Sequence, residues 1–138
     1  MYVIRKEFKF EMAHRLMTSY TEVCQNIHGH GYILELFFKG SMLNEDGMIV
    51  DFKKVKDELK SYIESWDHTL VLHKDDPLNH AIGDIVKESF SLKSVAYNPT
   101  AENMSRDMYD YIKEKFPILW KVRLHETKTG YAEYFEEE

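Results

Sequence analysis

The chain has 138 residues, 43% of them apolar and 30% charged, which is the composition of a folded domain with room for a hydrophobic core. Its net charge of −6 argues against a nucleic-acid or anionic-membrane partner. No run approaches the roughly 18 apolar residues of a membrane span, and the N-terminus lacks the apolar centre of a signal peptide. The single cysteine fits a reducing compartment. We therefore expect one cytoplasmic domain over residues 1–138.

The first half of the chain predicts two strands and a helix. Polar and apolar residues alternate over residues 2–14, which predicts a strand with one buried face. Residues 31–40 are rich in β-branched and aromatic side chains and predict a second strand. Asp51 stands where a helix N-cap belongs, and apolar residues follow it at helical spacing from Phe52 to Trp66.

The last forty residues predict a second long helix and two short strands. Thr100 is the N-cap candidate of this helix, and Pro117 stops it. Residues 120–128 and 130–135 predict strands that are joined by a turn.

The segment 69–98 has the weakest secondary-structure pattern in the chain. Residues 77–90 predict a short helix and residues 93–98 a strand. The order of elements predicts an α+β fold in which helices cover one face of an antiparallel sheet.

Three histidines are expected to meet where the first two strands pair. His28 and His30 are two residues apart, so on a strand both side chains project to the same side. His14 is the last residue of the first strand. In an antiparallel ribbon the end of the first strand lies near the start of the second, so His14 is expected near His28 and His30. Three histidines without a fourth obligatory ligand are typical of catalytic zinc. In the alternative interpretation the pair is a surface feature of the strand and His14 is unrelated.

Cys24 lies four residues before His28. A nearby cation stabilises a thiolate, so this thiol is a candidate base in the same cavity. Two alternatives remain open. The thiol could be buried and inert, or it could bind the ion and close a purely structural site.

Three further residues are candidates for proton transfer or substrate binding. Asp67 precedes His68 at the end of the first helix, where the pair either caps the helix or forms a proton relay. Glu126 is either a solvated strand end or a carboxylate that accepts two N–H bonds from a cyclic guanidine-like group. The other histidines have no distinctive spacing and are expected to be structural or at the surface: His73, His80 and His125.

These residues lie in motifs that resemble the 6-pyruvoyl-tetrahydropterin synthase and 6-carboxytetrahydropterin synthase family. In chain order the motifs are "FEMAHRL", "CQNIHGHGY", "GMIVDF", "WDH", "NPTAEN" and "HET". The resemblance implies the tunnelling fold, with an antiparallel four-stranded sheet and two long helices packed on one face. It also implies a homohexamer, built as a dimer of trimers, with sites at subunit interfaces.

The resemblance implies a role for each candidate residue. Zinc would be bound by the histidines of the first two strands: His14, His28 and His30. Cys24 would abstract a proton, with Asp67 and His68 as its relay partners. Glu126 would anchor the pterin ring, and Thr100 belongs with it among the substrate-binding candidates.

The implied activity is that of a lyase acting on 7,8-dihydroneopterin triphosphate. We favour the 6-carboxytetrahydropterin product, formed with loss of acetaldehyde and triphosphate in queuosine biosynthesis, because the compact chain looks like the bacterial type. The 6-pyruvoyl product and a non-catalytic pterin- or purine-binding module are the alternatives. Arg15 and Lys128 are candidates to contact the triphosphate. The stretch from His68 to Pro99 is longer than in compact bacterial members and could reshape the pocket.

Overall fold

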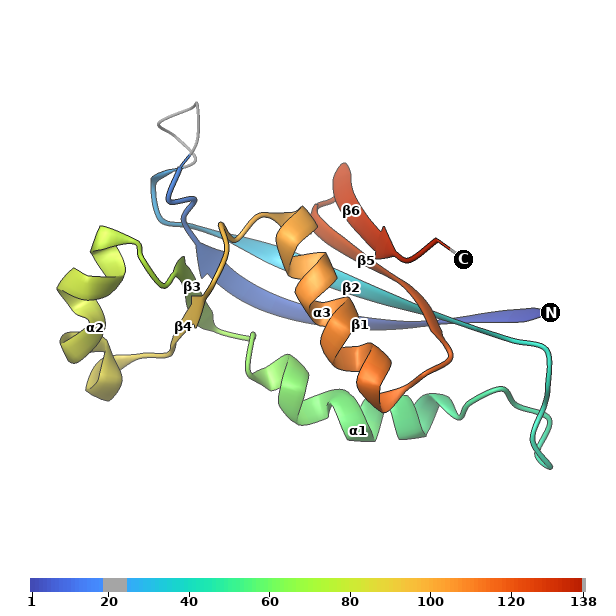
Figure 1. Ribbon diagram of the computed structural model, residues 1–138. Coiled ribbons are helices and arrows are strands. Elements are labelled where there is room, and N and C mark those ends of the chain that lie inside the picture. Colours follow the sequence, from blue (N-terminus) through green and yellow to red (C-terminus); the bar gives the residue numbers. More distant parts are fainter. Residues whose placement is uncertain (19–24, 138) are drawn as a thin grey trace.

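The computed structural model describes residues 1–18 and 25–137 of the chain. These residues form six strands and three helices (Figure 1). In chain order the elements are β1 (Tyr2–His14), β2 (His28–Gly40), α1 (Phe52–Glu64), β3 (Thr69–His73), α2 (Pro77–Ser89), β4 (Leu92–Val95), α3 (Ala101–Lys115), β5 (Leu119–Thr127) and β6 (Gly130–Phe135).

All strands belong to one sheet with the order β4-β3-β1-β2-β5-β6. The four strands β1, β2, β5 and β6 pair antiparallel, as predicted. Strand β3 pairs parallel with β1, and β4 pairs parallel with β3. The α+β class is therefore confirmed, but the prediction of a four-stranded antiparallel sheet is wrong, because the sheet is mixed and has six strands.

The two parallel strands, β3 and β4, come from the segment 69–98, where the secondary-structure pattern of the sequence is weakest. Strand β3 reads "TLVLH" and its first four residues are all buried, so it lacks the alternation that marks a strand with one solvated face. The helix α2 connects β3 to β4, as expected of a parallel pair, whose connection must cross the sheet. The predicted short helix over residues 77–90 is present as α2, and the strand predicted over residues 93–98 is present in part as β4.

Helices α1 and α3 lie on one face of the sheet, and α2 lies at one end beside β3 and β4 (Figure 1). Both predicted N-caps are confirmed. An Asp51 side-chain oxygen accepts from the Lys53 amide at 2.8 Å, and Thr100 Oγ1 accepts from the Asn103 amide at 3.2 Å. Among the described residues, no helix is long and apolar enough to cross a membrane.

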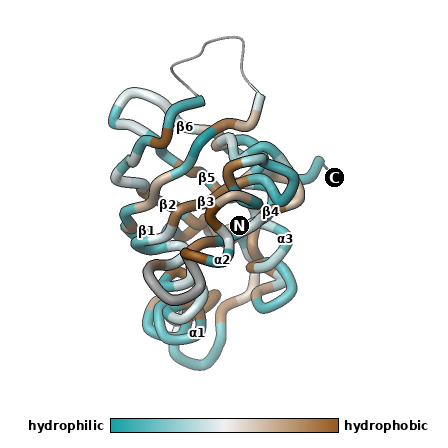
Figure 2. Tube along the Cα trace, turned by 90° about the vertical axis from the view of Figure 1, so that its left-hand side faces the viewer, coloured by the Kyte–Doolittle hydropathy of each residue, from teal (hydrophilic) through white to brown (hydrophobic). Residues whose placement is uncertain are grey.

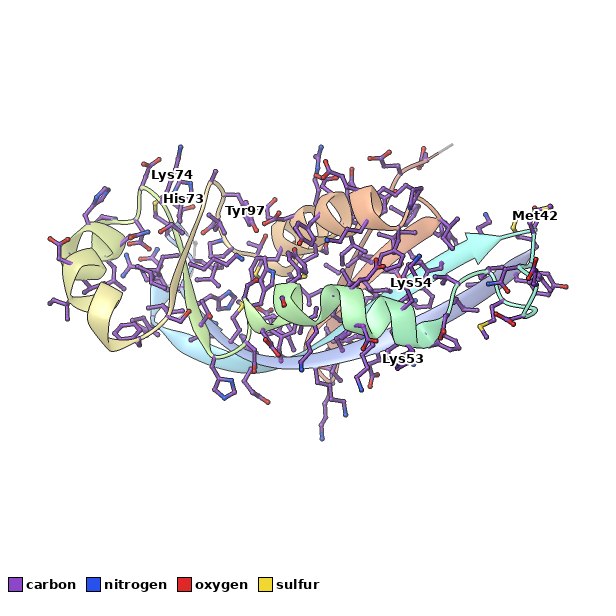
Figure 3. The ribbon with its side chains drawn as sticks, turned by 90° about the horizontal axis from the view of Figure 1, so that it is seen from below. Met42, Lys53, Lys54, His73, Lys74 and Tyr97 are labelled. Atoms are coloured by element: carbon purple, nitrogen blue, oxygen red, sulfur yellow. The ribbon has the colours of Figure 1, made fainter. Side chains whose placement is uncertain are left out.

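The core lies between the sheet and helices α1 and α3. Hydrophobic stretches of strands and helices face one another there, whereas hydrophilic residues follow the outer turns (Figure 2). In the view from below, Met42 lies at one end of the molecule, and His73 and Lys74 lie toward the other end, near α2 (Figure 3). Strand β2 contributes Tyr32, Leu34, Leu36 and Phe38 to the core. His28 and His30 continue this inward-facing row at the start of the strand.

Candidate active site

The register of β1 and β2 brings the three histidines together. His14 pairs with His28, and Met12 pairs with His30, so all three imidazoles project to the face that carries the helices. The ligand nitrogens of the three histidines all lie within 4.8 Å of one another. The predicted convergence of His14, His28 and His30 is therefore present, and these residues could hold a metal ion.

Hydrogen bonds to the backbone orient two of the rings. Nδ1 of His14 lies 2.8 Å from the carbonyl oxygen of Pro99, and Nδ1 of His28 lies 2.8 Å from that of Asn26. A carbonyl only accepts, so each Nδ1 must carry the proton and each neutral ring presents a lone pair at Nε2. Such contacts behind the ligand nitrogen are usual in metal sites.

His30 completes the cluster with a buried nitrogen that forms no hydrogen bond among the described residues. Its Nε2 atom is buried and forms no hydrogen bond within the described part of the chain. Burial lowers the pKa of His30, which favours the neutral form that a metal ion requires. An orphaned, neutral nitrogen beside two oriented lone pairs fits a bound divalent cation.

Glu126 reaches the histidines from β5, the strand next to β2. Its Oε1 atom lies 3.2 Å from Nε2 of His14 and 3.5 Å from Nε2 of His30. A hydrogen bond with His14 is the main cause that lowers the pKa of the Glu126 carboxyl, and burial opposes it. His14 can donate through both nitrogens only as a cation. Without such a charge, the Nε2 lone pairs of His14 and His28 and the Glu126 carboxylate would face one another, so the cluster favours an added proton or a metal ion.

Glu126 also lines a pocket of about 470 Å³. The pocket lies between the start of α3 and the β5–β6 hairpin, and Ala101, Thr127 and Tyr131 are among its other lining residues. The carboxylate therefore connects the histidine cluster with a space that a small planar molecule could enter. Thr100, the N-cap of α3, directly precedes this wall.

Tyr32 is a site residue that the sequence analysis did not single out. Its ring lies edge-on to His30, with the ring centroids 5.6 Å apart, and its side chain is 1% exposed. Burial is the main cause that raises the pKa of its hydroxyl, and the nearby Glu126 charge adds to this effect. The signal was present in "HGHGY", because Tyr32 continues the two-residue spacing of His28 and His30.

Asp67 and His68 form the predicted carboxylate–imidazole pair. Nδ1 of His68 lies 2.9 Å from an Asp67 carboxylate oxygen, while the other oxygen accepts from the Glu11 amide at 2.8 Å. The Glu11 amide is the main cause that lowers the pKa of Asp67, and His68 adds to it. His68 has a φ of 56°, which is uncommon for a residue other than glycine and marks a position constrained by its surroundings.

The Asp67–His68 pair does not face the histidine cluster of its own chain. Thr69 pairs with the inward-facing Met12, so the preceding His68 points to the opposite face of the sheet. There its side chain is 79% exposed and borders a pocket of about 450 Å³ that Glu11 and Gly31 also line. His30 also contributes to the lining of this pocket, but among the described residues of one subunit no hydrogen bond or ion pair joins Asp67 or His68 to the three imidazoles.

Two other candidates have different outcomes. Cys24 lies outside the described residues. Arg15 was a candidate to contact the triphosphate. In the structure it pairs with Asp76, whose side chain is fully buried, with 2.9 Å between Nε and the carboxylate oxygen. This ion pair gives Arg15 a structural partner at the start of α2.

The sequence matches a known protein family and is similar to known proteins over most of its length. The family model for 6-pyruvoyl tetrahydropterin synthase matches residues 3–137. A protein described as 6-carboxy-5,6,7,8-tetrahydropterin synthase in Aquifex aeolicus is 33% identical, over 97% of this chain and 98% of its own length. A protein of the same description in Rickettsia bellii is 34% identical, over 93% of this chain and 96% of its own length.

Solved structures show the same fold. An uncharacterised protein from Wolinella succinogenes superposes with a TM-score of 0.85 at 22% identity, covering 99% of this chain and 98% of its own. The 6-pyruvoyl tetrahydropterin synthase of Caenorhabditis elegans superposes with a TM-score of 0.70 at 23% identity, covering 99% of this chain and 96% of its own.

Proposed function

The chain belongs to the 6-pyruvoyl tetrahydropterin synthase family, and we propose that it is a zinc-dependent 6-carboxytetrahydropterin synthase. Its substrate would be 7,8-dihydroneopterin triphosphate, with acetaldehyde and triphosphate released. The observation that carries the proposal is the convergence of three histidine nitrogens beside a half-buried carboxylate. The curated relatives that bear the 6-carboxy description support this product over the 6-pyruvoyl one.

Zinc suits the site because it accepts three imidazole ligands and keeps a further position for substrate. His14, His28 and His30 would hold it. When bound, zinc would polarise oxygens of the substrate side chain and acidify the adjacent C–H bonds. The buried, neutral His30 and the oriented lone pairs of His14 and His28 support this assignment.

Glu126 would bind the pterin ring. Pterin presents two N–H groups along one edge, and a carboxylate accepts such a pair with both oxygens. Its lowered pKa keeps the carboxyl ionised near neutral pH, as this role requires. The pocket that Glu126 lines supports a substrate position next to the histidine cluster, with Thr100 at its edge.

Proton transfer would use groups from two subunits. We infer that Cys24 acts as the base beside the zinc ion of its own chain, whereas Asp67 and His68 complete the site of a neighbouring subunit. The pair's position on the opposite face of the sheet, with His68 exposed, supports this arrangement. The assembly would be a homohexamer of two trimers, with the sites between subunits.

Product analysis tests the proposal. The zinc-loaded protein is incubated with 7,8-dihydroneopterin triphosphate, and acetaldehyde and triphosphate are quantified. We expect the two to form in equal amounts. Triphosphate without acetaldehyde would instead establish the 6-pyruvoyl reaction, and tight pterin binding without turnover would establish a binding module.

A further inference from the structure

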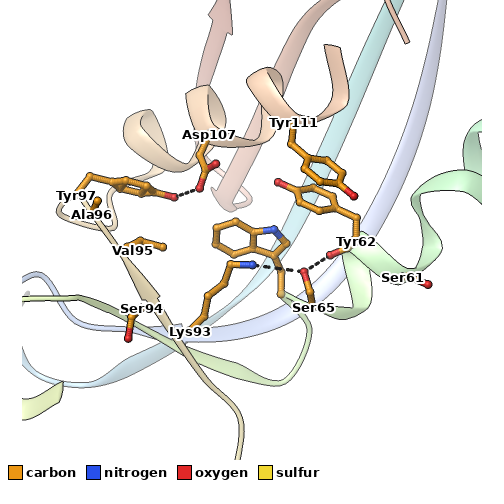
Figure 4. A pocket seen from close by; sticks show the side chains of 11 residues that line it. Ser61, Tyr62, Ser65, Lys93, Ser94, Val95, Ala96, Tyr97, Asp107 and Tyr111 are labelled. Carbon is orange, nitrogen blue, oxygen red and sulfur yellow. Dashed lines mark hydrogen bonds between the residues drawn. The ribbon is translucent and has the colours of Figure 1, made fainter. Parts of the chain in front are cut away.

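A second pocket lies on the helical side of the molecule, between α1, β4 and α3 (Figure 4). Its volume is about 690 Å³, within the usual range for small-molecule sites. None of its lining residues belongs to the histidine cluster or to the pockets that Glu126 and His68 border. The pocket is therefore separate from the candidate active site.

Aromatic rings form much of its wall. Tyr62 and Tyr111 stack, with their centroids 3.8 Å apart and their planes 7° from parallel. The hydroxyl of Tyr62 points into the pocket, whereas that of Tyr111 points the opposite way (Figure 4). On the other side, the Tyr97 hydroxyl donates to Asp107. The wall therefore offers flat apolar surfaces to a ligand.

Two buried donors at the pocket have no partner. Trp66 is 1% exposed, yet its Nε1–H group forms no hydrogen bond within the described residues, and the same holds for the buried Tyr62 hydroxyl. The indole lowers the pKa of Tyr62 somewhat, so the two groups are neighbours, but their geometry is not that of a hydrogen bond. Burial is the larger influence and raises that pKa. Unpaired buried donors are costly, which points to an acceptor that completes them.

Lys93 adds a cation at the same place. Its Nζ atom lies 4.2 Å from the centroid of the Trp66 ring and 3.4 Å from Ser65 Oγ. In the part of the chain that the structure describes, Lys93 forms no ion pair with a carboxylate. Burial lowers the pKa of Lys93. The charge of Asp107 opposes this effect, although Asp107 is too far from Lys93 to form an ion pair with it. The ammonium group is thus partly desolvated and has no direct counter-ion among the described residues.

We propose that this pocket binds a small organic carboxylate with a flat apolar body. The carboxylate would accept from Lys93, from the indole N–H of Trp66 and from the hydroxyl of Tyr62, and the body would lie against the tyrosine rings. A singly charged anion fits better than a phosphate, because one lysine faces the pocket together with the Asp107 carboxylate.

Fluorine NMR of the full-length protein labelled with fluorotryptophan tests the proposal, because the chain has only two tryptophans. The probe is naphthoate, and naphthamide is its neutral isostere. We expect naphthoate to shift the Trp66 signal saturably while the Trp120 signal stays in place. Naphthamide should bind about tenfold more weakly or worse, because it lacks the charge that Lys93 meets.

Substitutions distinguish binding through the Lys93 charge from non-specific hydrophobic association. Lys93→Met and Tyr62→Phe should each weaken naphthoate binding, Lys93→Met by about tenfold or more. Tyr62→Phe keeps the stacked ring and therefore serves as the variant that preserves folding. Lys39→Met is the matched control, because Lys39 lies over the other indole, 5.0 Å from the Trp120 centroid.

Four outcomes would overturn the proposal. The first is an unchanged Trp66 signal at saturating naphthoate, and the second is equal binding of naphthamide. The third is a parallel shift of both tryptophan signals, which would mean non-specific association. The fourth is a Trp66 signal that moves with protein concentration in the absence of probe, which would assign the pocket to a second copy of the chain.

Discussion

Nε2 of His14 lies 3.1 Å from Nε2 of His28. Both rings have a carbonyl oxygen at Nδ1, so in their neutral forms both nitrogens in this contact are acceptors. Two acceptors at that distance repel each other unless a positive charge lies between them or beside them. The backbone carbonyls of Pro99 and Asn26 thus set a protonation pattern that favours a cation at the cluster.

Removing one imidazole should abolish stoichiometric metal binding. We expect His30→Ala to lose zinc, because its buried Nε2 atom is a ligand nitrogen that forms no hydrogen bond among the described residues. His80→Ala, an exposed position on α2, is the control and should retain zinc. Metal analysis of purified protein gives the result, and full zinc content in His30→Ala would contradict the assignment.

Glu126→Gln should impair catalysis while the metal stays bound. The amide keeps the shape of the carboxylate but loses its charge and one acceptor, so we expect kcat/KM to fall roughly a hundredfold. Glu102→Gln is the matched control, because Glu102 lines the same pocket and is exposed. Steady-state kinetics and zinc content are measured together. A variant with unchanged kcat/KM would exclude Glu126 as the pterin anchor.

The proposed division of the site between subunits predicts complementation. Cys24→Ala and His68→Ala should each be inactive alone, because each removes one proton-transfer group from every site. Mixed oligomers formed by co-refolding should regain roughly a quarter of wild-type activity if subunits assort randomly and each site draws on two of them. Failure to regain activity, with mixed oligomers demonstrated by mass spectrometry, would place both groups in one subunit.

Asp67 should make the stability of the protein depend on acid pH. Its pKa is lowered in the folded state, chiefly by the Glu11 amide, so its stabilising contribution is present above the unfolded value of about 3.9. That contribution is lost as the pH falls through the folded pKa. The difference in unfolding free energy between wild type and Asp67→Asn should therefore shrink below about pH 4.

Chemical denaturation at several pH values measures this difference. Asp110→Asn, an exposed position on α3, is the control. A difference between wild type and Asp67→Asn that is constant down to pH values well below the unfolded pKa would show that the amide contact does not stabilise the carboxylate.

Arg15→Met should destabilise the fold. The substitution leaves the fully buried Asp76 without its cation, and breaking such a pair costs about 3 kcal/mol. Arg106→Met is the control, since Arg106 is exposed on α3 and lies over the Tyr134 ring without a buried partner carboxylate among the described residues. Urea unfolding of both variants tests the difference, and equal midpoints would contradict a structural role for the ion pair.

The sequence predicted those elements whose periodicity is strong. The alternation of residues 2–14 and the apolar stripe after Asp51 each report one buried face, and both elements appear within a few residues of their predicted bounds. Strand β3 was missed because "TLVLH" is buried without alternation, and the parallel pairing of β4 depends on contacts distant in sequence. Local pattern carries no information about such pairing.

The candidate site, like the fold, was predictable from the sequence only in part. The two-residue spacing of His28 and His30 follows from strand geometry, and the pairing of β1 with β2 adds His14. The carbonyl of Pro99 could not be identified from sequence, because its contact with His14 spans 85 residues. The orientation of His68 away from the cluster also required the register between β1 and β3.

X-ray absorption spectroscopy of the zinc-loaded protein tests the metal centre most directly. We predict a shell of three imidazole nitrogens at about 2.0–2.1 Å, an additional light oxygen or nitrogen ligand, and no sulfur near 2.3 Å. A zinc–sulfur distance in that shell would make Cys24 a ligand and the site structural. A spectrum without imidazole scattering would remove the ion from the three histidines altogether.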